Sequence, residues 1–152
     1  MLGWAKSPKI LGSPYAAVNP FRFGDVPWDG KKHTSENGSG RVYSIAKGRT
    51  VFDCSGFVVA AYRKAGVDLA KHGLTTTGAF HNDTKFLRPV ATGDLKPGDL
   101  ILYKAHKGIG HVVIYLGNGQ AIEAQSKKGV SINAVRWDDV KSCRRVPLHE
   151  VG

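Results

Sequence analysis

One cysteine, one histidine and one glutamate stand where they could form a thiol-based catalytic site. Cys54 follows Asp53, His111 opens an apolar run, and Glu123 lies in the next apolar run. Only a thiolate is a good nucleophile, so a catalytic cysteine needs a lowered pKa and a base close by. Histidine can supply the base, and an acid can orient the histidine. The order of these three residues therefore indicates a cysteine hydrolase.

The segment that carries Cys54 has the apolar spacing of a core-facing helix over residues 54–66. Asp53 is the expected N-cap of this helix and Gly66 its expected C-cap. Cys54 would then lie at the helix N-terminus, where unpaired N–H groups and the helix dipole favour a thiolate. A small cysteine on such a helix is also common in protein cores, so Cys54 alone does not decide the function.

His111 and Glu123 are expected on the two strands of one hairpin, residues 111–116 and 120–125, which Gly117-Asn118-Gly119 joins. Across a loop with an odd number of residues, positions an even number apart share a face. The two side chains would then be diagonal neighbours about 7–8 Å apart. A loop with an even number of residues would put them on opposite faces and remove the pair.

The remaining patterns predict an α+β fold in one domain of 152 residues, because helices come first and antiparallel strands follow. We expect N-terminal helices packed on a small antiparallel sheet or half-barrel of about 5–6 strands. A first arm covers residues 1–50, with an insertion at 25–50, and the core covers 51–148. The other expected elements are short helices near 13–18 and 74–83, a short strand or helical turn at 41–45, a loop or edge strand at 86–90, and strands at 100–103, 129–135 and 143–146.

The composition allows several kinds of partner. With 22 basic and 12 acidic residues the formal charge is +10, which attracts nucleic acid, anionic lipid and anionic cell-wall polymers. No nucleic-acid motif accompanies the charge, so specific binding of nucleic acid is not expected. No apolar stretch approaches about 18 residues, so no membrane span is expected. The N-terminal residues also lack the apolar core of a signal peptide.

Neither a metal nor another cofactor is expected. The chain has two cysteines and no Cys-x-x-Cys pair, and we expect Cys143 to be an isolated thiol. The histidines other than His111 have no metal-ligand spacing; they are His33, His72, His81, His106 and His149.

Three linked segments resemble the NlpC-type family of papain-like cell-wall cysteine peptidases. They are Asp53-Cys54-Ser55-Gly56-Phe57, the run Leu-Lys-Pro-Gly-Asp-Leu at 95–100, and the run Gly-His-Val-Val-Ile-Tyr-Leu-Gly-Asn-Gly at 110–119. The resemblance covers residues 52–135 and implies a papain-like core. It also implies cleavage of peptidoglycan stem peptides, most often between γ-D-glutamate and a diamino acid.

The resemblance assigns roles residue by residue. It implies that Cys54 is the nucleophile, His111 the base and Glu123 the third polar residue. Asp53 and Ser55 match positions that line the side of the site that takes the N-terminal part of the substrate.

The segment before Cys54 departs from the family pattern. Members usually carry a Pro-Tyr-x-Trp-Gly-type segment whose tyrosine hydroxyl faces the site. The nearest match is Pro-Phe-Arg-Phe-Gly at 20–24, which places Phe21, without a hydroxyl, beside the substrate. The backbone N–H of Cys54 is one expected oxyanion donor, and either Tyr43 or Tyr15 is left as the second.

The leading hypothesis is a monomeric peptidoglycan endopeptidase that acts outside the cell or at the wall, as an excised domain of a secreted hydrolase or as a phage lysin or tail peptidase. A catalytically inactive wall-binding module on the same scaffold is the first alternative. An amidase or transpeptidase that uses the same triad is the second, and a nucleic-acid-binding protein rests on the charge alone.

Overall fold

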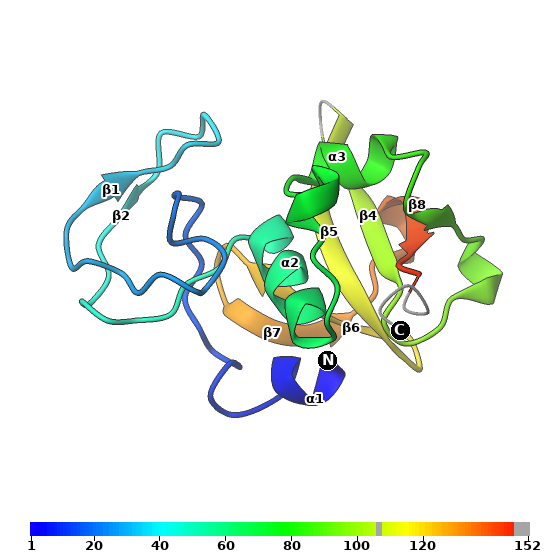
Figure 1. Cartoon of the computed structure of the whole chain (residues 1–152), viewed down its shortest axis with the longest axis horizontal. Helices are drawn as coiled ribbons and strands as arrows, with labels where there is room; N and C mark the ends of the chain where they lie inside the picture. Colours follow the sequence, from blue (N-terminus) through cyan, green and yellow to red (C-terminus); the bar gives the residue numbers. More distant parts are fainter. Residues whose placement is uncertain (106–107, 148–152) are drawn as a thin grey trace.

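A computed structural model describes residues 1–105 and 108–147 and confirms the α+β fold. Its centre is a six-stranded antiparallel sheet in the order β3-β8-β4-β5-β6-β7 (Figure 1). The strands are β3 (Arg88–Pro89), β4 (Leu100–Ala105), β5 (Gly108–Gly117), β6 (Gln120–Gln125), β7 (Gly129–Ala134) and β8 (Val140–Arg145).

The described residues also form three short 3-10 helices: Ala70–His72 before β3, Thr92–Asp94 between β3 and β4, and Trp137–Asp139 between β7 and β8. Within the described part of the chain, every helix is too short or too polar to cross a membrane. The last position of the predicted core, 148, and the histidines His106 and His149 lie outside the described residues.

The helix that carries the cysteine, α2, spans Cys54–Lys64 and begins where the sequence predicts. Asp53 is its N-cap and accepts a hydrogen bond from the backbone N–H of Gly56 at 2.7 Å. The helix ends two residues before its predicted stop, and Gly66 follows with a φ of 85°, a left-handed conformation that suits glycine after a helix. Helix α2 packs against β5 and β6, so the sheet fixes the position of its N-terminus (Figure 1).

The two faces of the sheet bury alternate residues, as expected for strands with a side-chain period of two. Leu102 and Ile114 belong to the large core that includes α2, whereas Tyr103 and Val113 belong to a separate cluster with Cys143. Each of these side chains is at most 2% exposed. Burial of one such apolar side chain stabilises the fold by about 1.5–3 kcal/mol.

The segment at residues 13–18 does not form the predicted short helix. The backbone there is extended: the carbonyl of Pro14 accepts a hydrogen bond from the N–H of Phe52, and the N–H of Ala16 donates to the carbonyl of Phe52. These bonds use backbone groups that a helix would need. The first helix, α1, lies instead at Leu2–Ala5. Because it pairs with Phe52, Tyr15 lies close to the start of α2.

The insertion at residues 25–50 has a small structure of its own beside the main sheet (Figure 1). Strands β1 (His33–Thr34) and β2 (Val42–Tyr43) form a two-stranded antiparallel sheet. Its core is a cluster separate from the main one: Ala16, Val18, Phe21, Trp28, Tyr43 and Val51. The insertion is therefore anchored by buried apolar side chains.

Helix α3 (Thr77–Asn82) begins three residues later than the sequence predicts, because the hydroxyl of Thr76 caps it by accepting from the N–H of Ala79. The helix packs against β5 and β8 (Figure 1).

Gly56 provides a test of how closely the first turn of α2 packs. A Cβ atom at Gly56 would lie 2.0 Å from the carbonyl oxygen of Arg22, a backbone atom that cannot simply move aside. We expect Gly56→Ala to lower the free energy of unfolding by about 3 kcal/mol, as overpacking does. The measurement is urea unfolding followed by circular dichroism.

The matched control is Gly78→Ala in α3, where nothing lies within 4 Å of the added atom. This change should leave the free energy of unfolding unchanged or raise it by about 0.5–1 kcal/mol, because alanine is the better helix former. Equal effects of the two substitutions would contradict the packing argument.

Candidate active site

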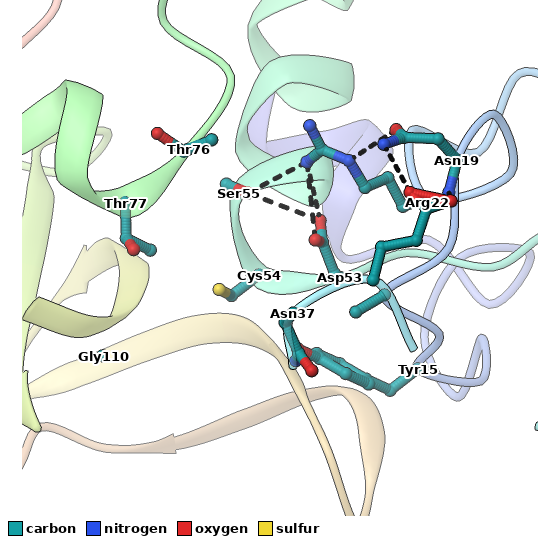
Figure 2. A pocket seen from close by; sticks show the side chains of 12 residues that line it. Tyr15, Asn19, Arg22, Asn37, Asp53, Cys54, Ser55, Thr76, Thr77 and Gly110 are labelled. Carbon is teal, nitrogen blue, oxygen red and sulfur yellow. Dashed lines mark hydrogen bonds and ion pairs between the residues drawn. The ribbon is translucent and has the colours of Figure 1, made fainter. Parts of the chain in front are cut away.

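Cys54 lies in the wall of a cavity of about 290 Å³ at the N-terminus of α2 (Figure 2). Its side chain is 8% exposed and its thiol is free. The walls come from five parts of the chain: the arm before the insertion, the β1–β2 connection in the insertion, the start of α2, the start of α3 and strand β5. The lining residues are Tyr15, Ala17, Asn19, Arg22, Glu36, Asn37, Asp53, Cys54, Ser55, Thr76, Thr77 and Gly110.

His111 and Glu123 meet as the hairpin geometry predicts. Nε2 of His111 lies 2.8 Å from Oε1 of Glu123, and their side chains are 17% and 4% exposed. The turn itself differs from the prediction, because Gly117 pairs with Gln120 and only two residues connect them. A bulge between Tyr115 and Gly117 adds one residue to β5 and restores the parity that brings the two side chains to one face.

The environment of His111 favours its charged form. Burial disfavours the imidazolium, but interactions with Cys54 and Glu123 outweigh burial and raise the pKa of His111 to about 9. Because an ionised carboxylate only accepts hydrogen bonds, Nε2 of His111 carries a proton toward Glu123. That arrangement leaves Nδ1 as the ring nitrogen that can exchange a proton with the Cys54 thiol.

Two further side chains hold this pair in place. Asn133 on β7 donates from Nδ2 to Oε2 of Glu123 at 3.3 Å, so the second carboxylate oxygen also has a partner. The ring of Tyr103 on β4 stacks on the ring of His111 with centroids 6.0 Å apart and an interplanar angle of 20°. Neither residue was identified from the sequence. The alternation of β7, which puts Asn133 on the face of Glu123, is the signal that could have found the first.

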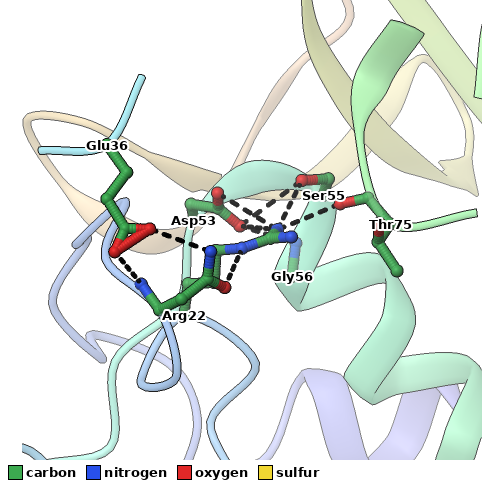
Figure 3. Close-up of polar contacts among 7 residues, drawn as sticks. Arg22, Glu36, Asp53, Ser55, Gly56 and Thr75 are labelled. Atoms are coloured by element: carbon green, nitrogen blue, oxygen red, sulfur yellow. Dashed lines mark hydrogen bonds and ion pairs between the residues drawn. The ribbon is translucent and has the colours of Figure 1, made fainter. Parts of the chain in front are cut away.

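Arg22 lies in the wall of the Cys54 cavity, where it binds Asp53 and Ser55 (Figure 3). Its Nη1 donates to both carboxylate oxygens of Asp53 at 3.3 and 3.4 Å, to Oγ of Ser55 at 3.1 Å and to the carbonyl of Thr75 at 3.0 Å. Burial raises the pKa of the Asp53 carboxyl, while the Arg22 charge and the Gly56 N–H oppose that rise. Asp53 and Ser55 thus lie beside Cys54, but Arg22 already occupies much of their hydrogen-bonding capacity.

Glu36 and Asn37, in the connection between β1 and β2 of the insertion, also line this cavity. The carboxylate of Glu36 accepts from the backbone N–H of Asn19 at 3.2 Å and from its Nδ2 at 2.9 Å. Asn19 in turn accepts from Nε of Arg22 at 2.8 Å. The insertion is therefore hydrogen-bonded to the wall that also contains Asp53 (Figure 3).

The tyrosine beside Cys54 is Tyr15, and the structure does not place Phe21 there. Phe21 packs in the core of the insertion, with its ring centroid 4.9 Å from that of Trp28 and 5.3 Å from that of His33. Tyr15 lines the Cys54 cavity (Figure 2). Burial raises the pKa of its hydroxyl, and the nearby Cys54 and Asp53 add to the rise, so Tyr15 remains a hydrogen-bond donor at neutral pH.

The expectation that Phe21 stands beside Cys54 is therefore wrong, because Phe21 packs in the apolar cluster of the insertion. The Pro-Tyr pair at 14–15 was the signal that could have corrected it. Tyr43 lies behind Tyr15, with ring centroids 6.4 Å apart, and lines a neighbouring groove of about 470 Å³ that contains Tyr15 but not Cys54.

A second cavity, of about 450 Å³, lies on the His111 side and shares Tyr15 and Gly110 with the first. We call it the His111 cavity. Its lining residues are Tyr15, Gly110, His111, Glu123, Gln125, Ser126, Lys127 and Arg136. The thiol and the imidazole thus lie where two cavities adjoin, as a site needs when it holds both sides of a bond to be cleaved.

These groups suit nucleophilic attack on a carbonyl by a thiolate. They provide a thiol at a helix N-terminus, an imidazole with a raised pKa, and a carboxylate on the far side of the ring. In the part of the chain that the structure describes, no group of three or more His, Cys, Asp or Glu side chains could hold a metal ion.

The sequence is similar to that of known proteins. Residues 29–144 match the NlpC/P60 family. The chain is 38% identical over 102 residues to a probable endopeptidase p60 from Listeria welshimeri, which covers 66% of this chain and 17% of that protein. It is 42% identical over 84 residues to the peptidoglycan DL-endopeptidase CwlO from Bacillus licheniformis, which covers 55% of this chain and 18% of that protein. The chain therefore spans less than a fifth of the length of either relative.

Solved structures show the same fold. The P60 domain of an M. avium paratuberculosis antigen superposes with a TM-score of 0.59 at 24% identity, over 90% of this chain and 84% of that one. The peptidoglycan hydrolase RipB from Mycobacterium tuberculosis superposes with a TM-score of 0.52 at 26% identity, over 91% of this chain and 58% of that one. Because the family model matches residues 29–144, which are most of its length, the chain belongs to the NlpC/P60 family.

Proposed function

We propose that this chain is a peptidoglycan endopeptidase that hydrolyses stem peptides at the bond between γ-D-glutamate and the following diamino acid. The observation that carries the proposal is the contact of Glu123 with His111 beside Cys54, where two cavities adjoin. The likeness to CwlO, which is named a DL-endopeptidase, supports the choice of bond.

In the proposed reaction, His111 takes the proton of the Cys54 thiol, and the thiolate attacks the γ-carbonyl carbon. The backbone N–H of Cys54 at the helix N-terminus and the protonated hydroxyl of Tyr15 stabilise the oxyanion that forms. His111 then gives its proton to the leaving amine as the carbon–nitrogen bond breaks. Water attacks the resulting thioester, again with His111 as base, and regenerates the thiol.

The surroundings of the enzyme follow from its substrate. We expect it to act at the cell wall, outside the membrane, whether a bacterium or a phage encodes it. The charge of +10 favours contact with an anionic wall, with an attraction that weakens as salt rises. A monomer is sufficient, because one chain supplies every group in the mechanism.

Product analysis on purified sacculi tests the proposal. We expect new amino groups on the diamino acid and no increase in reducing sugar. When a muramidase then cuts the glycan strands, mass spectrometry should identify a disaccharide dipeptide that ends in D-glutamate. Free peptides that begin with L-alanine would identify an amidase instead. Newly joined peptides of higher mass would identify a transpeptidase, and the absence of any product would favour an inactive wall-binding module.

A second bond is a specific alternative, because the chain is also 32% identical over 83 residues to an Escherichia coli protein named murein DD-endopeptidase MepS. Cleavage of cross-linked dimers into monomers with intact stem peptides would support that activity and contradict the proposed bond.

A further inference from the structure

The His111 cavity must hold the leaving group if the proposed function is correct. The histidine that accepts the thiol proton must later deliver it to the leaving amine, so that amine lies on the His111 side of the sulfur. The acyl part of the substrate then lies in the Cys54 cavity, beside Asp53 and Ser55. The side chains around His111 are therefore those that meet the residue downstream of the cleaved bond.

The rim of the His111 cavity carries two exposed cationic side chains, Lys127 and Arg136. Its one acidic residue is Glu123, whose side chain is 4% exposed and bonded to both His111 and Asn133. The cavity therefore presents positive charge to a ligand. A surface of this kind favours a carboxylate.

Arg136 is held in position for such a ligand. Its Cζ lies 4.3 Å from the ring centroid of Tyr103, and its backbone N–H donates to the Tyr103 hydroxyl at 3.2 Å. One nitrogen, Nη1, donates to Asp139 at 3.2 Å. A guanidinium has five N–H donors, so this ion pair leaves donors on Arg136 for a second carboxylate.

Lys127 lines the same cavity from a different segment of the chain. It lies in the turn between β6 and β7, next to Ser126, whose carbonyl accepts from Nη1 of Arg41 at 3.1 Å (Figure 1). Arg41 belongs to the insertion, and its Cζ lies 4.8 Å from the ring centroid of Tyr43. The insertion thus tethers the turn that carries Lys127.

We propose that Lys127 and Arg136 bind a carboxylate on the residue whose amine leaves. The enzyme would then prefer stem peptides whose diamino acid has a side chain ending in a free carboxylate over those in which this group is a carboxamide. This inference rests on the proposed function, and it adds a preference for the downstream side of the substrate.

Two synthetic peptides that differ only in this carboxylate or carboxamide test the inference. We expect wild-type kcat/KM to be about tenfold higher for the carboxylate, the size of a charge-assisted hydrogen bond to arginine. The ratio should fall to about threefold in Lys127→Gln and in Arg136→Gln, and toward one in the double variant. It should also shrink between about 0.01 M and 1 M salt, because salt screens exposed charges.

Lys85→Gln is the matched control, since Lys85 is exposed, lies between α3 and β3 and lines neither cavity. It removes the same charge and should keep the full ratio. Arg136→Lys should restore part of the ratio that Arg136→Gln loses. Because the readout is a ratio of two substrates, a general loss of activity through Tyr103 and His111 cancels.

The possible failures are distinguishable. Equal cleavage of both peptides by the wild type, or a ratio that the double variant does not change, overturns the inference and leaves the proposed function intact. Cleavage of neither peptide overturns the proposed function, and the inference with it.

Discussion

Replacing Cys54 with alanine is expected to lower kcat for stem-peptide hydrolysis by at least about 10⁴-fold, because the acyl-enzyme intermediate can no longer form. The residual rate would come from substrate binding and oxyanion stabilisation alone. Cys54 is close enough to His111 to raise the pKa of the imidazole, and its thiol forms no disulfide. Release of amines from sacculi under initial-rate conditions measures the loss.

Cys143→Ala is the matched control, because Cys143 is the only other cysteine and is also free. Its side chain is 2% exposed and packs on the face of the sheet with Ile101 and Val113. We expect its loss to reduce stability by about 1–2 kcal/mol while kcat stays within about twofold. Comparable losses of activity in both variants would show that the effect of Cys54→Ala is structural.

Thiol labelling separates the two cysteines by a measurement that needs no substrate. In the folded Cys143→Ala variant, iodoacetamide should modify Cys54, which lines a cavity. In the folded Cys54→Ala variant, Cys143 should react only after the protein is unfolded. Labelling of Cys143 in the folded protein would contradict its burial.

The sequence was sufficient to predict the positions of Cys54, His111 and Glu123, because local chemistry determines each of them. The N-cap at Asp53 determines where α2 begins. The pairing of His111 with Glu123 depends only on parity across one hairpin. The bulge that preserves this parity was not predicted, because the sequence Gly-Asn-Gly at 117–119 fits both a three-residue loop and a two-residue turn with a bulge.

The groups that come from distant segments were not predictable in the same way. Arg22 reaches Asp53 across 31 positions, and Asn133 reaches Glu123 from the next strand. Tyr15 lies beside Cys54 only because the arm pairs with Phe52 while the insertion packs as a separate cluster. These arrangements depend on how segments dock, and the spacing of residues along the chain does not encode that.

Replacing Glu123 with glutamine is expected to move the alkaline limb of the pH–rate profile to lower pH. In the wild type, kcat/KM should fall as pH rises through about 9, the pKa of His111, because the imidazolium that protonates the leaving amine is lost. The Glu123 carboxylate raises that pKa through a hydrogen bond and its charge. Its removal therefore lowers the pKa of His111, and the imidazolium loses its proton at lower pH.

The neutral amide of Glu123→Gln keeps a hydrogen-bond acceptor for the ring. The orientation of His111 is therefore largely kept, while its pKa falls. We therefore expect kcat to fall by about 10–100-fold, less than for loss of the nucleophile, while the alkaline limb shifts by about one pH unit or more. Glu36→Gln is the matched control, because Glu36 lines the Cys54 cavity and bonds to Asn19. Glu36→Gln should not change the pH of the alkaline limb, even if KM changes. If the limb moved equally in both variants, the acid that sets the pKa of His111 would not be Glu123. If it moved in neither, a group other than His111 would protonate the leaving amine.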